Sequence, residues 1–211
     1  MRVVITGFGP FPGAPFNPSA ALAKALARRR RPAFADLDRA THVFATTYAS
    51  VDRDLPKLLA QKPDLVLMFG VAGRRRDVCV ETRAHNAMSV LFPDAGGHRP
   101  QLGIIACGAT AARRGNAPFA ALAGATRTAK FPARLSRDAG RYLCNYLYWR
   151  ALEHAGADNG KALVQFVHIP PIGGKPRRKG ATKPQPTLAQ FIKTAEALLI
   201  ALVVASRTRE P

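Results

Sequence analysis

The amino-acid sequence predicts an α/β fold with a largely parallel sheet. Short β-branched or apolar runs alternate with longer helix-forming segments along the chain, which is the pattern of α/β proteins. The run Leu65–Phe69 is apolar throughout and ends at Gly70, as expected of a strand buried on both faces. With 211 residues and 47% hydrophobic content, the chain can build one sizeable core and is too short to favour two domains.

The first third of the chain predicts strand, loop, helix, strand, helix and strand in order. Arg2–Thr6 is β-branched and stops at Gly7. Ala20–Arg31 is strongly helix-forming, with Asn17 placed to cap the helix and Pro18 in its first turn. The elements expected next are a strand at His42–Thr47, a helix at Val51–Gln61 and the strand at Leu65–Phe69.

Two glycine-containing loops follow strands of this predicted sheet. Ligands of open α/β sheets gather beyond the carboxyl ends of the strands, so Gly7–Phe11 and Gly70–Gly73 are expected at one ligand-binding edge. The first loop carries Phe8, Phe11 and Phe16. Large aromatic residues on a connection either line a pocket or cover the core, and the sequence leaves both interpretations open.

The remaining two thirds are less regular until the region of Cys144. Gly103–Cys107 is expected to be a short strand, and Gly108–Pro132 to be irregular with at most one helix around Phe119–Leu122. The apolar helix that carries Cys144 should begin between Ser136 and Arg141. The last expected elements are a strand at Ala162–Val167 that delivers His168, a mobile basic loop at Gly173–Pro186 and a docked helix at Thr187–Val204.

Three residues in these elements suggest thiol chemistry when they are taken together. The first turn of a helix lowers a thiol's pKa, which suits Cys144 as a nucleophile, although a free cysteine on an apolar helix is commonly a core residue. His168 at a strand end is either a base or packing, and Glu81 beside Arg74–Arg76 is ordinarily a surface or salt-bridged carboxylate. A cysteine hydrolase needs a thiolate, an imidazole and often a group that orients the imidazole.

Other classes of site have little support in the sequence. The three cysteines form no CxxC pair, and their odd number suits a reducing compartment. The five histidines show no HxxxH or HExxH spacing, so no metal is expected. No run of about 18 uncharged apolar residues is present, and the first ten residues do not resemble a signal peptide. We therefore expect a soluble cytoplasmic protein without a membrane role.

The net charge of +19 raises the possibility of a nucleic-acid-associated protein. The charge is divided among short clusters, with no aromatic-rich RNP pattern, zinc knuckle or helix-turn-helix signature beside them. A solvated basic surface explains the composition more simply, with only non-specific adhesion to polyanions expected. The clusters are Arg28–Arg31, Arg74–Arg76, Arg113–Arg114 and Arg177–Lys179.

Four motifs, taken in order, resemble the pyroglutamyl peptidase I family, the pyrrolidone-carboxylate cysteine peptidases. The resemblance spans nearly the whole chain and implies a single three-layer α/β/α domain over residues 1–211, with no metal or organic cofactor. It also implies a homo-oligomer, a dimer or tetramer, that removes N-terminal pyroglutamate from peptides. The motifs are TGFGPFPGAPFNPS at Thr6–Ser19, ExxAxN from Glu81 within Gly70–Asn86, AGRYLCN at Ala139–Asn145 and FVHIP at Phe166–Pro170.

The resemblance also assigns roles to individual residues. Cys144 would be the nucleophile, His168 the acid and base, and Glu81 the group that orients the imidazole. The positions that match the substrate pocket are Phe8 and Phe11, whose rings would flank the lactam, and Thr46, Val71 and Tyr142.

Three positions depart from the pattern of the family. Val71 stands where bacterial relatives commonly carry Gln, Thr82 where Arg is frequent, and Leu91 where some members have an Arg near the oxyanion site. These differences bear on the substrate more than on the chemistry. They leave open a divergent or inactive member that acts on another small cyclic amide, beside the alternative of a basic nucleic-acid-associated protein on the same scaffold.

Overall fold

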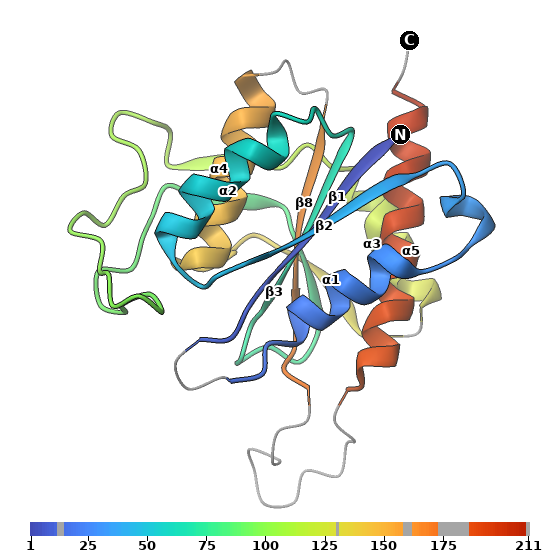
Figure 1. Ribbon diagram of the computed structural model, residues 1–211, viewed down its shortest axis with the longest axis horizontal. Coiled ribbons are helices and arrows are strands. Elements are labelled where there is room, and N and C mark those ends of the chain that lie inside the picture. The colour runs from blue at the N-terminus through green and yellow to red at the C-terminus, as the bar shows by residue number, and fades with distance from the viewer. Residues whose placement is uncertain (12–14, 130, 158–161, 173–185, 210–211) are drawn as a thin grey trace, which may run out of the picture.

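In the computed structural model, which describes residues 1–11, 15–129, 131–157, 162–172 and 186–209, a six-stranded sheet lies between two layers of helices (Figure 1). The fold class predicted from the sequence is confirmed. The strands of this sheet are β1 (Arg2–Phe8), β2 (Asp38–Phe44), β3 (Leu65–Val71), β4 (Val78–Glu81), β7 (Ala133–Ser136) and β8 (Leu163–Ile169). The helices are α1 (Pro18–Arg28), α2 (Tyr48–Leu59), α3 (Phe119–Thr128), α4 (Leu143–Ala157) and α5 (Leu188–Arg207), with a 3-10 turn at Pro32–Phe34.

The strand order is β2-β1-β3-β8-β4-β7, and one pairing in it is antiparallel. The first four strands run parallel to one another, whereas β4 runs antiparallel to β8 and parallel to β7. As a result, the end of β4 that carries Glu81 lies beside the middle of β8. A separate two-stranded sheet is formed by β5 (Arg83–His85) and β6 (Ala112–Arg114).

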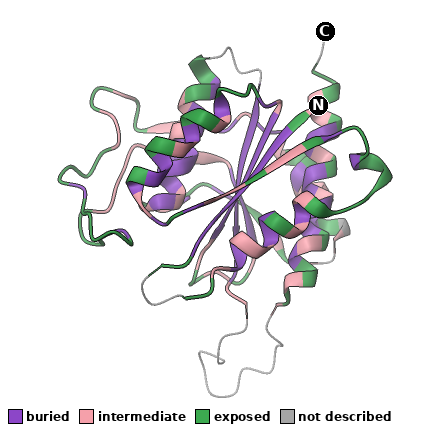
Figure 2. Cartoon of the chain, in the orientation of Figure 1, coloured by how far each residue is buried: buried purple, intermediate pink, exposed green. Residues whose placement is uncertain are grey.

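The two faces of the sheet belong to two separate hydrophobic clusters. Helices α1, α3 and α5 cover one face, and α2 and α4 cover the other (Figure 1). Alternate residues of β3 enter different clusters: Leu65, Leu67 and Phe69 face α1 and α5, whereas Val66 and Met68 face α2 and α4. The central strands are buried on both sides, as the colouring of Figure 2 makes visible.

The first turns of α1 and α5 are set by capping residues that can be recognised in the sequence. The Asn17 side chain accepts from Ser19 N and caps α1, as predicted, with Pro18 as the first helical residue. Thr187 caps α5 in a capping box with Gln190. By length and composition α5 is long and apolar enough to cross a membrane, but its apolar residues, among them Phe191 and Leu198, pack in the core beside α1.

Several predicted boundaries are wrong. Helix α4 starts at Leu143 and not between Ser136 and Arg141, because Ser136 belongs to β7 and Gly140 adopts φ +84°, which no helix accepts. The strand predicted at Gly103–Cys107 is absent from this described segment, where Ile105 N and Ala106 N donate to the Asn86 side chain instead.

Other differences are shifts in extent. Strand β2 covers Asp38–Phe44, earlier than His42–Thr47. The helix expected around Phe119–Leu122 is present and extends to Thr128 as α3, and the same segment also contains β6. Phe8 is the last residue of β1 and does not belong to the loop. Most of the predicted basic loop at Gly173–Pro186 lies outside the described residues.

Candidate active site

Successive side chains of a strand point to opposite faces of the sheet, and on β3, β4 and β8 the candidate positions fall on the face covered by α4. His168 follows the α4-facing Phe166 by two positions on β8. Val78 and Val80 of β4 pack on the opposite face, so Glu81 points to the α4 side. Gly70 shares the parity of Met68 on β3, and it therefore lies under the helix that carries Cys144.

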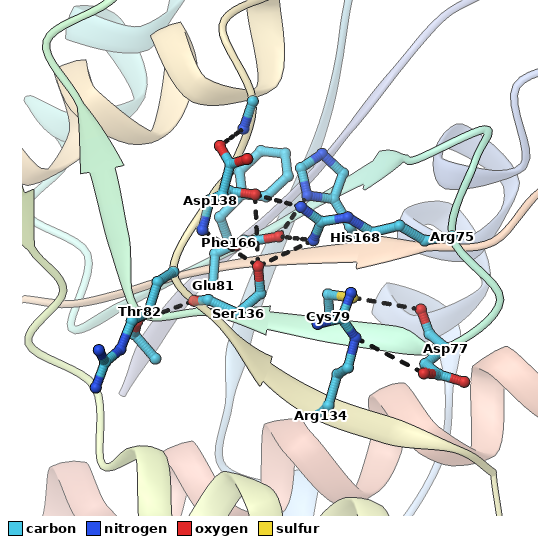
Figure 3. Close-up of polar contacts among 12 residues, drawn as sticks. Arg75, Asp77, Cys79, Glu81, Thr82, Arg134, Ser136, Asp138, Phe166 and His168 are labelled. Carbon is cyan, nitrogen blue, oxygen red and sulfur yellow. Dashed lines mark hydrogen bonds and ion pairs between the residues drawn. The ribbon is translucent and has the colours of Figure 1, made fainter.

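Glu81 and His168 meet directly. Nδ1 of His168 lies 2.8 Å from Oε1 of Glu81 (Figure 3). Glu81 is fully buried and His168 is 5% exposed, so water competes little for this contact. Of the two ordinary interpretations of Glu81 taken alone, burial excludes the surface carboxylate, and the salt-bridged one holds, since Arg75 also pairs with it.

Cys144 lies over the residue of β3 that pairs with His168. It is the second residue of α4, so its backbone N–H is one of the amides that the hydrogen bonds of a helix leave unpaired. The thiol lies over the sheet at Gly70, where an added Cβ would come within 2.7 Å of Sγ. Gly70 therefore provides the space in which the sulfur sits.

The environment of His168 favours its charged form. Burial acts against the imidazolium, but the charge of Cys144 and a hydrogen bond to it, together with the contacts to Glu81, outweigh burial and raise the pKa of His168 to about 9. Because Nδ1 is engaged by Glu81, Nε2 is the nitrogen available for proton exchange with Cys144. The three side chains can thus keep the imidazole charged and transfer a proton, as nucleophilic catalysis requires.

The support around Glu81 includes residues that sequence reasoning missed. Arg75 Nη1 donates to Glu81 Oε1 at 2.6 Å (Figure 3), and the backbone carbonyl of Glu81 accepts from Tyr148 OH and from Gln165 Nε2, each at 3.0 Å. Three consecutive arginines gave a weak signal for Arg75. The sequence carries no signal for Tyr148 and Gln165, because their roles depend on how α4 and β8 pack.

The predicted pocket residues occupy different environments. Phe8 is 2% exposed and packs against Phe44 in the α2–α4 cluster, whereas Phe11 is 42% exposed. Thr46 Oγ1 donates to the carbonyls of Gly9 and Pro10, both at 3.1 Å, and so holds the loop that follows β1. The structure therefore places Thr46 behind the first glycine loop, with Phe11 at its surface.

Tyr142 and a long connection border the nucleophile. Tyr142 OH donates to Pro93 O at 2.8 Å, and Ser89 N donates to Arg141 O at 2.6 Å. Asp94, a buried carboxylate that the sequence did not single out, accepts from the backbone of Tyr48, at the start of α2, at 3.0 Å. These bonds attach the connection to both α2 and the segment before Cys144.

Two of the three departures from the family pattern, Val71 and Leu91, differ in position. Val71 ends β3, has the parity of Phe69, and packs against the cluster under α1 and α5, on the face away from Cys144. Leu91 is 73% exposed on the connection described above. The side chain of Val71 is thus not directed at the thiol.

No cluster of three or more His, Cys, Asp or Glu side chains suited to a metal ion occurs within the part of the chain that the structure describes. The polar groups that converge on His168 are instead a thiol and a carboxylate, and the carboxylate is already engaged by Arg75.

Comparison with known proteins finds relatives that match nearly the whole chain. A profile of the pyroglutamyl peptidase family matches residues 1–208. The pyrrolidone-carboxylate peptidase of Thermococcus kodakarensis is 32% identical over 100% of this chain and 99% of its own, and that of Thermococcus onnurineus is 34% identical over 94% and 97%. The crystal structure of Bacillus amyloliquefaciens pyroglutamyl peptidase I covers 97% of this chain and 98% of its own at 25% identity and TM-score 0.83.

The pyrrolidone carboxyl peptidase of Thermococcus litoralis is similar at TM-score 0.87 and 26% identity, covering 98% of this chain and 95% of its own. The residues matched by the family profile, 1–208, include all strands and helices described above. The chain belongs to the pyroglutamyl peptidase family of cysteine peptidases.

Proposed function

We propose that this protein removes an N-terminal pyroglutamyl residue from peptides through a thioester formed on Cys144. The observation that carries the assignment of residues is the position of the His168 imidazole, with Nδ1 2.8 Å from Glu81 Oε1 and with the Cys144 thiol over Gly70, the residue of β3 that pairs with His168. A buried carboxylate, an imidazole and a thiol in this order match the requirements of cysteine hydrolysis.

In the first half-reaction the Cys144 thiolate attacks the carbonyl carbon of the pyroglutamyl residue. A carbon–sulfur bond forms, and the carbonyl π electrons move to the oxygen. When the oxyanion collapses, the carbon–nitrogen bond breaks and the leaving amine takes a proton from Nε2 of His168. The products are a pyroglutamyl thioester and a peptide with a free N-terminus, and the imidazole is left neutral.

In the second half-reaction the neutral imidazole takes a proton from water. The resulting hydroxide attacks the thioester, the carbon–sulfur bond breaks, and pyroglutamate leaves as the thiolate and the imidazolium re-form. Glu81 holds the ring orientation and stabilises its positive charge through Nδ1 in both steps. The backbone N–H of Cys144, in the first turn of α4, serves as an oxyanion donor.

The lactam is assigned to the edge of the sheet beside Gly70 and the first glycine loop. Phe11 supplies an exposed aromatic surface there, and Thr46 holds the loop through Gly9 and Pro10. An uncharged cyclic amide suits apolar walls with a few backbone hydrogen bonds. Phe8, Val71 and Tyr142 contribute to this edge through the backbone and packing of the elements that carry them.

We also assign the protein to the cytoplasm, as a homo-oligomer, a dimer or tetramer. The three cysteines are free, which fits a reducing compartment. Several large apolar side chains are exposed on the connection after β5, as expected where a second copy packs. Light scattering coupled to size-exclusion chromatography gives the oligomeric state directly. These side chains are Leu91, Phe92 and Leu102.

The test is hydrolysis of a pyroglutamyl fluorogenic amide by the wild type, Cys144→Ser and Cys144→Ala, before and after iodoacetamide. Because Cys107 is exposed and would also be alkylated, Cys107→Ala is the matched control and should hydrolyse the amide like the wild type. Turnover should disappear in both Cys144 variants and after alkylation. Activity that survives Cys144→Ala would refute the mechanism, and a folded but inactive wild type would favour another cyclic amide as substrate.

A further inference from the structure

Arg75 differs from the two arginines beside it. It lies in the turn between β3 and β4, where its backbone N–H donates to Ala72 O at 3.0 Å. Arg74 and Arg76 are exposed, whereas the side chain of Arg75 is 20% exposed and directed inward. A run of three arginines thus contributes one guanidinium to the interior of the molecule.

This guanidinium shares one oxygen atom with the candidate catalytic histidine. Arg75 Nη1 lies 2.6 Å from Glu81 Oε1, the same atom that lies 2.8 Å from His168 Nδ1. The second oxygen, Oε2, is buried without a hydrogen-bond partner among the described residues. In a fully buried site a carboxylate stays ionised only when counter-charges compensate its lost hydration, so Arg75 supports the charge on which the Glu81–His168 contact depends.

The same side chain also reaches the segment that leads into the nucleophile helix. Nη1 donates to Ser136 Oγ at 3.0 Å, and Nη2 donates to the carbonyl of Asp138 (Figure 3). Ser136 ends β7, and the residues between it and Leu143 connect β7 to α4. A planar guanidinium can make such contacts in fixed directions, which a lysine ammonium cannot.

We propose that Arg75 is a positioning residue of the active site, which holds Glu81 in its contact with His168 and fixes the β7–α4 connection so that Cys144 lies beside the imidazole. The inference rests on the proposed function for its assay with substrate. Its physical content is that one side chain couples the carboxylate end of the site to the thiol end. Arg75 acts through Glu81 and the backbone and does not itself touch the reacting atoms.

Removal of Arg75 should change how kcat/KM depends on pH, because several charged or titratable groups surround Glu81. Without the cation, the buried site around Glu81 and His168 loses its positive partner, so the acidic limb of kcat/KM is expected to move to higher pH. The groups concerned are Arg75 from the β3–β4 turn, Cys79 from β4, His168 from β8, and Cys144 and Tyr148 from α4.

The experiment compares Arg75→Met and Arg75→Lys with Arg76→Met, a matched control that removes an exposed arginine from the same turn. We expect Arg75→Met to lower kcat about 10- to 100-fold with little change in KM, and to move the acidic limb upward. Arg75→Lys should bring the limb back toward the wild-type position while kcat stays reduced, because the charge returns without the fixed contacts. Arg76→Met should resemble the wild type.

A second readout separates this inference from the proposed function. The rate of alkylation of Cys144 by iodoacetamide, measured against pH in a Cys107→Ala background, reports the thiolate without any substrate. Its acidic limb should move upward in Arg75→Met even if the wild type hydrolyses no pyroglutamyl amide. A folded Arg75→Met with the kcat and both pH profiles of Arg76→Met would overturn the inference. If Arg75→Met does not fold, Arg75→Lys with unchanged kcat would overturn it.

Discussion

His168 and Glu81 are joined by a 2.8 Å contact between Nδ1 and Oε1, although they lie on strands that run in opposite directions. Cys79 of β4 pairs with His168 of β8, and Glu81, two residues further along, points to the same face. The single antiparallel pairing in the sheet therefore brings the carboxylate to the imidazole.

Replacing Glu81 tests the value of this contact. Glu81→Gln keeps the size of the side chain but removes the charge that stabilises the imidazolium and orients Nδ1–H. We expect kcat to fall by about 10²-fold or more, by analogy with amide substitutions in Ser-His-Asp sites. Steady-state kinetics on a pyroglutamyl amide measure the effect. Near wild-type turnover in a folded Glu81→Gln would show that the carboxylate does not assist the ring.

The raised pKa of His168 predicts an alkaline limit to catalysis. The ring is charged below about 9 and neutral above it, so proton donation to the leaving amine should fail as the pH rises through that value. Because burial lowers this pKa and the charge of Cys144 is the largest opposing cause, Cys144→Ala should lower it. NMR titration of the histidines follows the change, and an unaltered His168 midpoint in Cys144→Ala would contradict the coupling.

Gly70 is expected to tolerate no side chain. In Gly70→Ala the new Cβ would lie 2.7 Å from Cys144 Sγ and 2.8 Å from Phe166 Cζ, so the thiol must move. We predict a loss of about 1–3 kcal/mol in the free energy of unfolding and a much lower kcat. Gly73→Ala is the control, since a Cβ there meets no atom of the described residues within 4 Å. Equal turnover by both variants would place the sulfur elsewhere.

Val71 offers a test of how the substrate edge is built. Its side chain packs on the face away from Cys144, so Val71→Ala should lower the free energy of unfolding by about 1 kcal/mol and leave KM within about twofold of the wild type. Chemical denaturation and substrate titration give the two values. A tenfold increase in KM would instead show that the side chain contacts the lactam.

Asp94 is predicted to matter for stability and for the shape of the site. Its carboxylate accepts from Tyr48 N at 3.0 Å, Gly96 N at 2.9 Å and His98 N at 3.0 Å while 3% exposed. Asp94→Ala should cost about 3 kcal/mol in the free energy of unfolding, because buried amides lose a charged acceptor. Asp94→Asn keeps one carbonyl oxygen and should cost less. Urea unfolding distinguishes the two, and a loss below about 1 kcal/mol in Asp94→Ala would contradict the role.

Much of the architecture is encoded in short segments of sequence. The uninterrupted apolar run at Leu65 predicts a central strand, and Asn17 and Pro18 predict the start of α1, because these signals act between neighbouring residues. Predicted element boundaries are wrong where a residue pairs with a strand that is distant in the sequence. Ser136 is drawn into β7 by pairing with β4, which delays α4 until Leu143.

The sequence by itself determined that a thiol, an imidazole and a carboxylate occur in family order at Cys144, His168 and Glu81, since chemical identity and spacing are properties of the chain. Only the tertiary structure decided that Glu81 is fully buried and that Arg75, and not its neighbours, reaches it. The physical reason is that burial and side-chain direction depend on which strands pair and which face a helix covers, and these contacts join residues far apart in the sequence.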